Sequence, residues 1–171
     1  WYVDNQKYTS IPANQNGDLS LTAKWTPIEY NISYNNTKGA SNSNPTHYNI
    51  ESSTIALSNI NAEGYIFNGW YNGDARITSI PVGSSGNIVL TAKWTPCDYS
   101  ITYNNTKGAI NNNATGFNTD SDTIILLDLQ KEGYTFDGWY NNGIKVTQIP
   151  KGTIGNVDLT AKWTPITYSA T

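Results

Sequence analysis

The side chains that most often carry catalysis are rare in this sequence. His47 is the only histidine, and Gly116 occupies the matching position in a second, similar segment. A nucleophilic Ser, Thr or Cys needs a base beside it, and histidine is the usual one. Cys97 is the only cysteine, and it stands where Ile28 and Ile166 stand in other copies, which favours an apolar role over a reactive thiol. We therefore expect no catalytic residues and no enzyme.

Carboxylates recur at matched positions: Glu29 and Asp98, Glu51 and Asp120, Glu63 and Glu132. An acid pair that hydrolyses a glycoside needs a cleft and partial burial, whereas these residues fall at expected strand ends and turns. The run Asp120-Ser121-Asp122 has acidic spacing typical of calcium loops, but it lacks the glycine and the closing glutamate. We therefore expect no metal site and no cofactor.

Aromatic pairs are the remaining candidates for contact with a ligand: Trp70, Tyr71, Trp139 and Tyr140. Strict alternation from Tyr65 and Phe67 would place Trp70 on the opposite face of its strand. There the indole could seal the far side of the sheet, pack across a module boundary or offer a stacking face to a sugar. Because aromatic side chains usually bury most of their area, a structural role is favoured over ligand stacking.

These residues are positioned by a repeat. The heptapeptide Leu-Thr-Ala-Lys-Trp-Thr-Pro occurs three times, each copy 69 residues after the last: 21–27, 90–96 and 159–165. The period divides the chain into the back of an incomplete repeat, two complete repeats and the start of another: 1–27, 28–96 (module one), 97–165 (module two) and 166–171. The two modules are identical at 38 of 69 positions.

Within a module the pattern is mostly that of strands. Tyr30–Tyr34 alternates apolar and polar residues, and Ile88, Leu90, Ala92 and Trp94 alternate inward later in the module. Gly69 interrupts a third alternating run and suggests a bulge or a close approach of another part of the chain. The stretch Leu57–Gly64 has room for at most one helical turn. We predict sheet-dominated α+β modules of about four strands, similar to small β-grasp units, with an all-β module as the alternative.

The boundary between modules predicts stiffness. The closing strand passes through Thr95-Pro96 almost directly into the next module, and proline restricts both its own φ and the residue before it. A junction this short cannot act as a free swivel. The incomplete repeat 1–27 also suggests part of a longer protein, and we expect this piece to pack on module one or on another molecule.

The composition narrows the range of possible binding partners. The net charge is −3, and the few Lys and Arg residues are scattered, which argues against nucleic acid and against an anionic membrane. No apolar run approaches the roughly 20 residues that span a bilayer.

Two linked motifs carry a resemblance to a known family. Gly-Tyr-x-Phe-x-Gly-Trp-Tyr at 64–71 and 133–140 precedes Leu-x-Ala-Lys-Trp at 90–94 and 159–163. This pattern resembles the Listeria–Bacteroides repeat, also called the internalin B-type repeat, over essentially the whole chain. The resemblance implies a β-grasp fold in the extracellular part of a bacterial cell-surface protein, attached to the cell wall or secreted. Two departures, at Ile60–Glu63 and in the Asn-rich loop after the first strand, weaken transfer of any particular binding activity.

Together these observations favour a non-enzymatic tandem module that acts as a semi-rigid spacer or stalk, with neighbouring repeats of the same chain as its partners. The alternative is an adhesin module that binds host glycan or surface protein through exposed aromatic and amide side chains.

Overall fold

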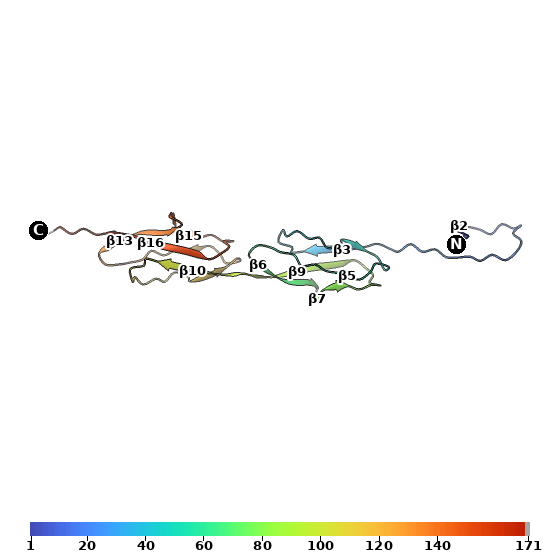
Figure 1. Cartoon of the computed structure of the whole chain (residues 1–171), viewed down its shortest axis with the longest axis horizontal. Helices are drawn as coiled ribbons and strands as arrows, with labels where there is room; N and C mark the ends of the chain where they lie inside the picture. The colour runs from blue at the N-terminus through green and yellow to red at the C-terminus, as the bar shows by residue number, and fades with distance from the viewer. Residues whose placement is uncertain (170–171) are drawn as a thin grey trace.

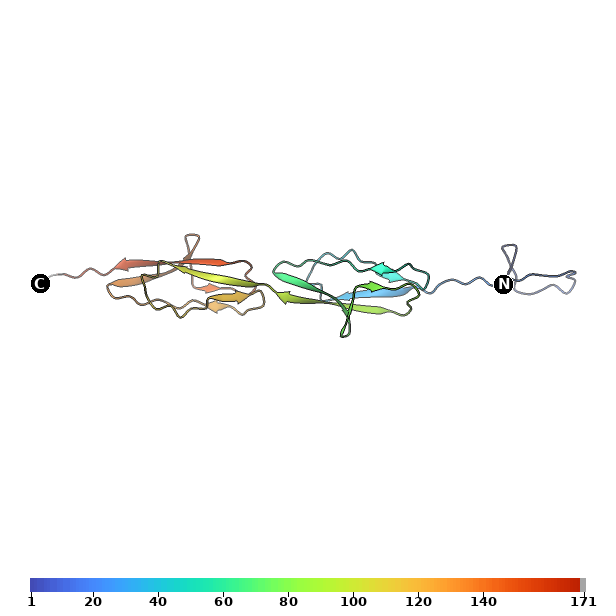
Figure 2. The same ribbon diagram turned by 60° about the horizontal axis from the view of Figure 1, so that its bottom comes forward.

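The chain forms an extended row of β-sheet units in the computed structural model, which describes residues 1–169 (Figure 1). An N-terminal hairpin lies at one end, the two modules follow in line, and the C-terminal segment continues from module two. Figure 2 shows the same in-line order from a view turned by 60°. The long axis of the molecule therefore follows the order of the repeats.

Module one is built from seven strands: β3 (Tyr30–Asn35), β4 (His47–Tyr48), β5 (Ile55–Ala56), β6 (Tyr65–Asn72), β7 (Ala75–Ile77), β8 (Ser79–Ile80) and β9 (Ile88–Pro96). Five of them form one sheet in the order β4-β3-β9-β6-β7, and β5 pairs with β8 in a second, two-stranded sheet. The pair β3 and β9 is parallel, whereas the other neighbours are antiparallel. A parallel pair requires a crossover connection, and β4 to β8 all lie within that connection.

Module two repeats this arrangement strand for strand: β10 (Asp98–Asn104), β11 (Gly116–Asn118), β12 (Ile124–Ile125), β13 (Tyr134–Asn141), β14 (Ile144–Val146), β15 (Gln148–Ile149) and β16 (Val157–Pro165). Its sheets have the orders β11-β10-β16-β13-β14 and β12-β15.

Each module has its own core, and the two buried clusters have no residue in common. Trp70 is 1% exposed, and its ring meets those of Tyr34 and Phe67 edge-on, with ring centres 4.9 and 5.4 Å apart. Leu90 and Ala92 of β9 are fully buried beside it. The predicted inward alternation of the last strand is confirmed, since Ile88 and Trp94, at the two ends of the alternating run, are partly buried and pack against the same cluster.

A β-bulge explains why Trp70 lies inside. The pairing of β6 with β9 shifts register between Phe67 and Gly69, so one extra residue intervenes and the next side chains change faces. Gly69 has a φ of +123°, which glycine adopts without strain. The bulge predicted at Gly69 is therefore present. The expectation that Trp70 points opposite to Phe67 is wrong, because strict alternation does not survive a bulge.

The predicted α+β class is also wrong: no residue between 1 and 169 is helical, and the modules are all-β. The stretch Leu57–Gly64 runs as irregular chain because its backbone groups are held by distant partners. Leu57 N–H donates to the Thr78 carbonyl at 2.9 Å, and the Asn44 side-chain amide both accepts from Ser58 N–H (2.6 Å) and donates to its carbonyl (3.0 Å). A short segment gains too few local hydrogen bonds to offset helix nucleation.

The N-terminal piece is a small hairpin away from module one (Figure 1). Strand β1 (Tyr2–Val3) pairs with β2 (Gln6–Lys7), and Tyr2 and Thr22 exchange two backbone hydrogen bonds. Within the described part of the chain, no hydrogen bond joins residues 1–24 to either module. No hydrogen bond therefore supports the expected packing of this piece on module one, and packing on another molecule stays a prediction.

Candidate functional site

The junction between the modules is where distant parts of the repeat converge. Strand β9 ends at Pro96 and β10 begins at Asp98, so Cys97 alone separates two strands that continue in one direction (Figure 2). Pro96 has no N–H and a restricted φ, which limits the freedom of this connection. Chain geometry alone therefore keeps the modules close, and side chains from both modules meet across the boundary.

The carbonyl of Gly64 is the centre of the junction. It accepts a hydrogen bond from Cys97 N–H at 2.9 Å and another from the hydroxyl of Thr119 at 2.6 Å. Thr119 N–H in turn donates to the carbonyl of Cys97 at 3.3 Å. Thr119 belongs to module two, follows β11, and is only 6% exposed. A turn of module one is thus joined to a loop of module two through both main chain and side chain.

Glycine is required at this turn for two separate reasons. Gly64 has a φ of +79°, and a Cβ built there would lie 2.8 Å from the Thr119 hydroxyl and 3.2 Å from Cγ1 of Ile154. Gly133, its equivalent in module two, has nearly the same φ (+77°), but a Cβ there would meet nothing within 4 Å. The two glycines therefore share a backbone requirement, while only Gly64 has a module packed against it.

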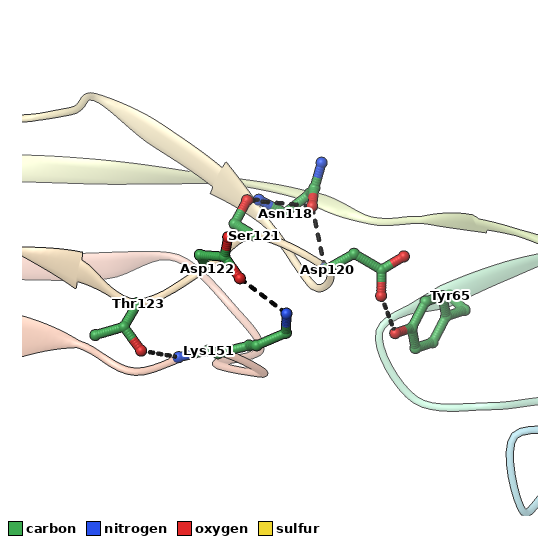
Figure 3. Close-up of polar contacts among 7 residues, drawn as sticks. All are labelled: Tyr65, Asn118, Asp120, Ser121, Asp122, Thr123 and Lys151. Atoms are coloured by element: carbon green, nitrogen blue, oxygen red, sulfur yellow. Dashed lines mark hydrogen bonds and ion pairs between the residues drawn. The ribbon is translucent and has the colours of Figure 1, made fainter.

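A second contact crosses the boundary beside the first. The hydroxyl of Tyr65 donates to a carboxylate oxygen of Asp120 at 2.5 Å (Figure 3). The loop that presents Asp120 is shaped by Asn118, whose side-chain oxygen accepts from the backbone N–H of Asp120 at 3.1 Å. Tyr65 is also covered by Lys38 of its own module, with the ammonium nitrogen 3.9 Å from the ring centre. The ring is therefore held from both modules.

An exposed ion pair completes this end of module two. Lys151 Nζ lies 2.9 Å from Oδ1 of Asp122, with both side chains largely in solvent (Figure 3). The hydrogen bond and charge of Lys151 lower the pKa of Asp122, and the same interactions raise the pKa of Lys151. Exposed pairs contribute little to stability, so this pair shapes the loop more than it stabilises the fold.

The candidate ligand contacts do not gather into one site. Trp70 and Trp139 are each 1% exposed, and each indole N–H donates to a backbone carbonyl at 2.9 Å, so neither offers a ring face to a ligand. Tyr71 and Tyr140 lie half-buried on the outer face of the sheets, where ligand contact stays a prediction.

Tyr71 has two cations near it. Lys93 Nζ lies 4.1 Å from its ring centre, and Arg76 pairs with it across β6 and β7. The Arg76 side chain lies over Gly69, where a built Cβ would be 2.6 Å from Nε. Module two keeps the same arrangement with two lysines, but adds two carboxylates on this face: Asp137 at the place of Asn68, and Asp158 at the place of Val89.

The remaining chemistry-bearing side chains stand apart. In residues 1–169, His, Cys, Asp and Glu nowhere gather in a group of three that could hold a metal ion. His47 is exposed and hydrogen-bonded only to the neighbouring Thr46 hydroxyl. Over the same residues, no helix is long and apolar enough to cross a membrane.

Comparison with known sequences identifies the repeat. The sequence profile of the Listeria-Bacteroides repeat domain matches residues 30–93 and again residues 99–162. The chain belongs to this family. The predicted resemblance is thereby confirmed, and the two matches fall one in each module. No solved structure is a significant match.

Among curated proteins, the Listeria-Bacteroides repeat chain is similar to one from Evansella cellulosilytica whose name reads "Putative Gly-rich membrane protein". The two are 26% identical over 174 residues, which is 95% of this chain but only 20% of the relative. The chain therefore spans about one fifth of the length of that relative.

Sequence reasoning missed the residues that make the junction. In the sequence, Gly64 stands out only as the end of the stretch Leu57–Gly64 and the start of the 64–71 motif, and nothing local distinguishes Thr119. The available signal was a substitution: the position that is Ile50 in module one is Thr119 in module two, a hydroxyl in place of an apolar side chain.

Proposed function

We propose that the modules are semi-rigid spacers in the extracellular part of a bacterial cell-surface protein. The observation that carries this proposal is the Gly64 carbonyl, which receives one hydrogen bond from the connecting chain and one from a side chain of the next module. A connection made only of flexible chain would let the modules reorient freely. Here the connecting strand, a shared acceptor and a glycine-sized gap all restrict that motion.

The cellular setting of the proposal is supported by the relatives. The repeat family is named for bacterial genera, and the Evansella relative is named as a membrane protein. A stiff tandem module suits the task of holding the outer part of such a protein away from the envelope, and this proposed role is non-enzymatic.

Small-angle X-ray scattering tests the spacer role. If a second copy of residues 97–165 is inserted after Pro165, the maximum dimension should grow by roughly 30–40 Å, since strands rise about 3.3 Å per residue. A matched control carries a flexible Gly-Ser insertion directly after Pro96, and its distance distribution should broaden. A maximum dimension that does not increase with the added copy would defeat the proposal.

A second candidate function is adhesion through the outer face of module one. The observation that favours it is the group of Tyr71, Lys93 and Arg76 around Gly69, on a face where module two has extra carboxylates. Cations and an aromatic ring on an open sheet suit an anionic host glycan or an acidic surface protein.

Binding to a glycan array tests this candidate. Tyr71→Ala should abolish binding, whereas Tyr140→Ala should leave most of it, because the carboxylates of module two oppose an anion. Binding that survives Tyr71→Ala, or no binding to any anionic glycan, would remove adhesion to a glycan from consideration.

A further inference from the structure

One end of module one carries apolar side chains that the described chain, residues 1–169, leaves largely exposed. Ile28, Ile50 and Val82 are 68%, 52% and 64% exposed. Beside them, a cleft of about 310 Å³ opens between Trp25, Ile28, Tyr30 and Ile50. We call the surface formed by Ile28 and Ile50 the apolar end of module one. Exposed apolar side chains gathered at one place often mark an interaction site.

The same surface of module two is occupied. Ile50 corresponds to Thr119, and Ile28 corresponds to Cys97. Thr119 is only 6% exposed because the Gly64 turn of module one packs against it. The junction thus shows what kind of structure fits this end of a module: a glycine turn with no Cβ, followed by a tyrosine.

The apolar end keeps the features that this turn needs. Isoleucine branches at Cβ as threonine does, so Ile50 can place γ-carbons where Thr119 contacts Gly64. The carbonyl of an incoming glycine would still find a backbone donor in Ile28 N–H, as Gly64 finds one in Cys97. That bond recurs at the next boundary, where Ile166 N–H donates to the Gly133 carbonyl at 2.9 Å. Glu51, at the place of Asp120, supplies a carboxylate for the tyrosine hydroxyl.

Two exposed indoles in residues 1–27 offer a way to detect the same occupant. Trp1 and Trp25 are 64% and 88% exposed, whereas Trp70, the equivalent of Trp1, is 1% exposed. In a complete module, the strands that cover these indoles and the glycine turn belong to one unit. A front half equivalent to residues 28–69 would cover both tryptophans and carry a Gly-Tyr turn to the apolar end.

We infer that the apolar end of module one is a docking site for the Gly-Tyr turn of another repeat in the same head-to-tail order. This second junction differs in kind from the first, because it relies on apolar contact where the Thr119 junction uses a side-chain hydrogen bond. The inference builds on the proposed spacer role, since both require modules that pack end to end.

A grafted chain tests this docking site. Residues 28–69 are placed directly before Trp1, which recreates the natural Gly69-Trp70 connection and completes the first repeat. The graft contains no tryptophan and no cysteine, so a blue shift in tryptophan emission reports burial of Trp1 and Trp25. In a Cys97→Ser background, Ile50→Cys should react with a thiol reagent at least about tenfold more slowly in the grafted chain than in the original.

The control position is Ile110, which is 82% exposed in module two. Ile110→Cys should react equally fast in both chains. A blue shift without slower labelling at position 50 would contradict the proposed docking site, because the repeat would then be complete but not docked. Unshifted emission would overturn it as well. Neither result depends on Gly64, so the spacer proposal can fail or stand separately.

Discussion

The two modules have separate but matching cores, and they differ at their ends. The most deeply buried core residues match, as in Trp70 and Trp139, Leu90 and Leu159, or Ala92 and Ala161, and each of these pairs has equal burial. The surface that faces a preceding module differs: Ile50 and Val82 in module one stand where Thr119 and Lys151 stand in module two. The fold therefore constrains the core positions, while the end surfaces are free to suit whichever neighbour they meet.

The largest expected effect on stability tests whether the two cores are equivalent. Trp70→Ala and Trp139→Ala each remove a fully buried indole, at a cost of about 3–5 kcal/mol in unfolding free energy. Because the surroundings match, the two costs should agree within about 1 kcal/mol. Urea denaturation, with each module followed through its own NMR signals, provides the measurement. A much smaller cost for one tryptophan would mean that the two cores are not equivalent.

A smaller loss of stability is expected when the asparagine side chain that holds the non-helical segment is removed. Asn44→Ala leaves the N–H of Ser58 without its partner, and Asn113→Ala does the same for Leu127, where each of these hydrogen bonds is 2.6 Å long. Each change should cost about 1–3 kcal/mol. Equal losses of stability in denaturant titrations would support the equivalence of the two cores. A gain of helical signal in circular dichroism would contradict the account of this segment.

The next prediction concerns the ends. Thr119→Val removes the side-chain donor to the Gly64 carbonyl and should lower the stability of module two by about 1 kcal/mol. Ile50→Val, at the matching exposed position, should change the stability of module one by less than about 0.5 kcal/mol. Thermal unfolding of each variant distinguishes the two. Equal effects would show that the junction gives module two no stability of its own.

The smallest effect is the pH dependence of the Asp122–Lys151 pair. The pKa of Asp122 is lowered from 3.8, so its contribution is present above that value and is lost as pH falls below it. The pKa of Lys151 is raised from 10.5, so its contribution is present below that value and is lost at higher pH. Asp122→Ser, which installs the residue of module one, should flatten the acid side of this profile slightly. An unchanged profile in acid titrations would show that the pair is irrelevant to stability.

Much of this architecture could be predicted from the sequence, because alternation and the repeat period are local signals. The strands around Tyr30 and Leu90 and the bulge at Gly69 follow from period-two patterning and an interrupting glycine. The side on which Trp70 lies could not be obtained by counting, because one extra residue in a bulge inverts every later side chain.

Long-range contacts account for the other errors. The segment Leu57–Gly64 ends in a glycine, and its equivalent in module two, Leu126–Gly133, carries three leucines; both features are compatible with a helical turn. Its conformation is decided by Asn44, 14 residues away from its partner Ser58. The junction is likewise made by Thr119, 55 residues from Gly64. Neither partner has a local signature, and only the difference between the two modules at Ile50 and Thr119 hints at the second.

The most direct test of the central claim compares Gly64→Ala with Gly133→Ala. The two glycines have φ values of +79° and +77°, so the local backbone cost should be similar, but only the new Cβ at position 64 would strike Thr119 and Ile154. Residual dipolar couplings of the unchanged chain should fit one common alignment for both modules. The account predicts that Gly133→Ala preserves this common alignment and Gly64→Ala destroys it. Independent alignment of the modules in the unchanged chain, or retention of a common alignment in Gly64→Ala, would contradict it.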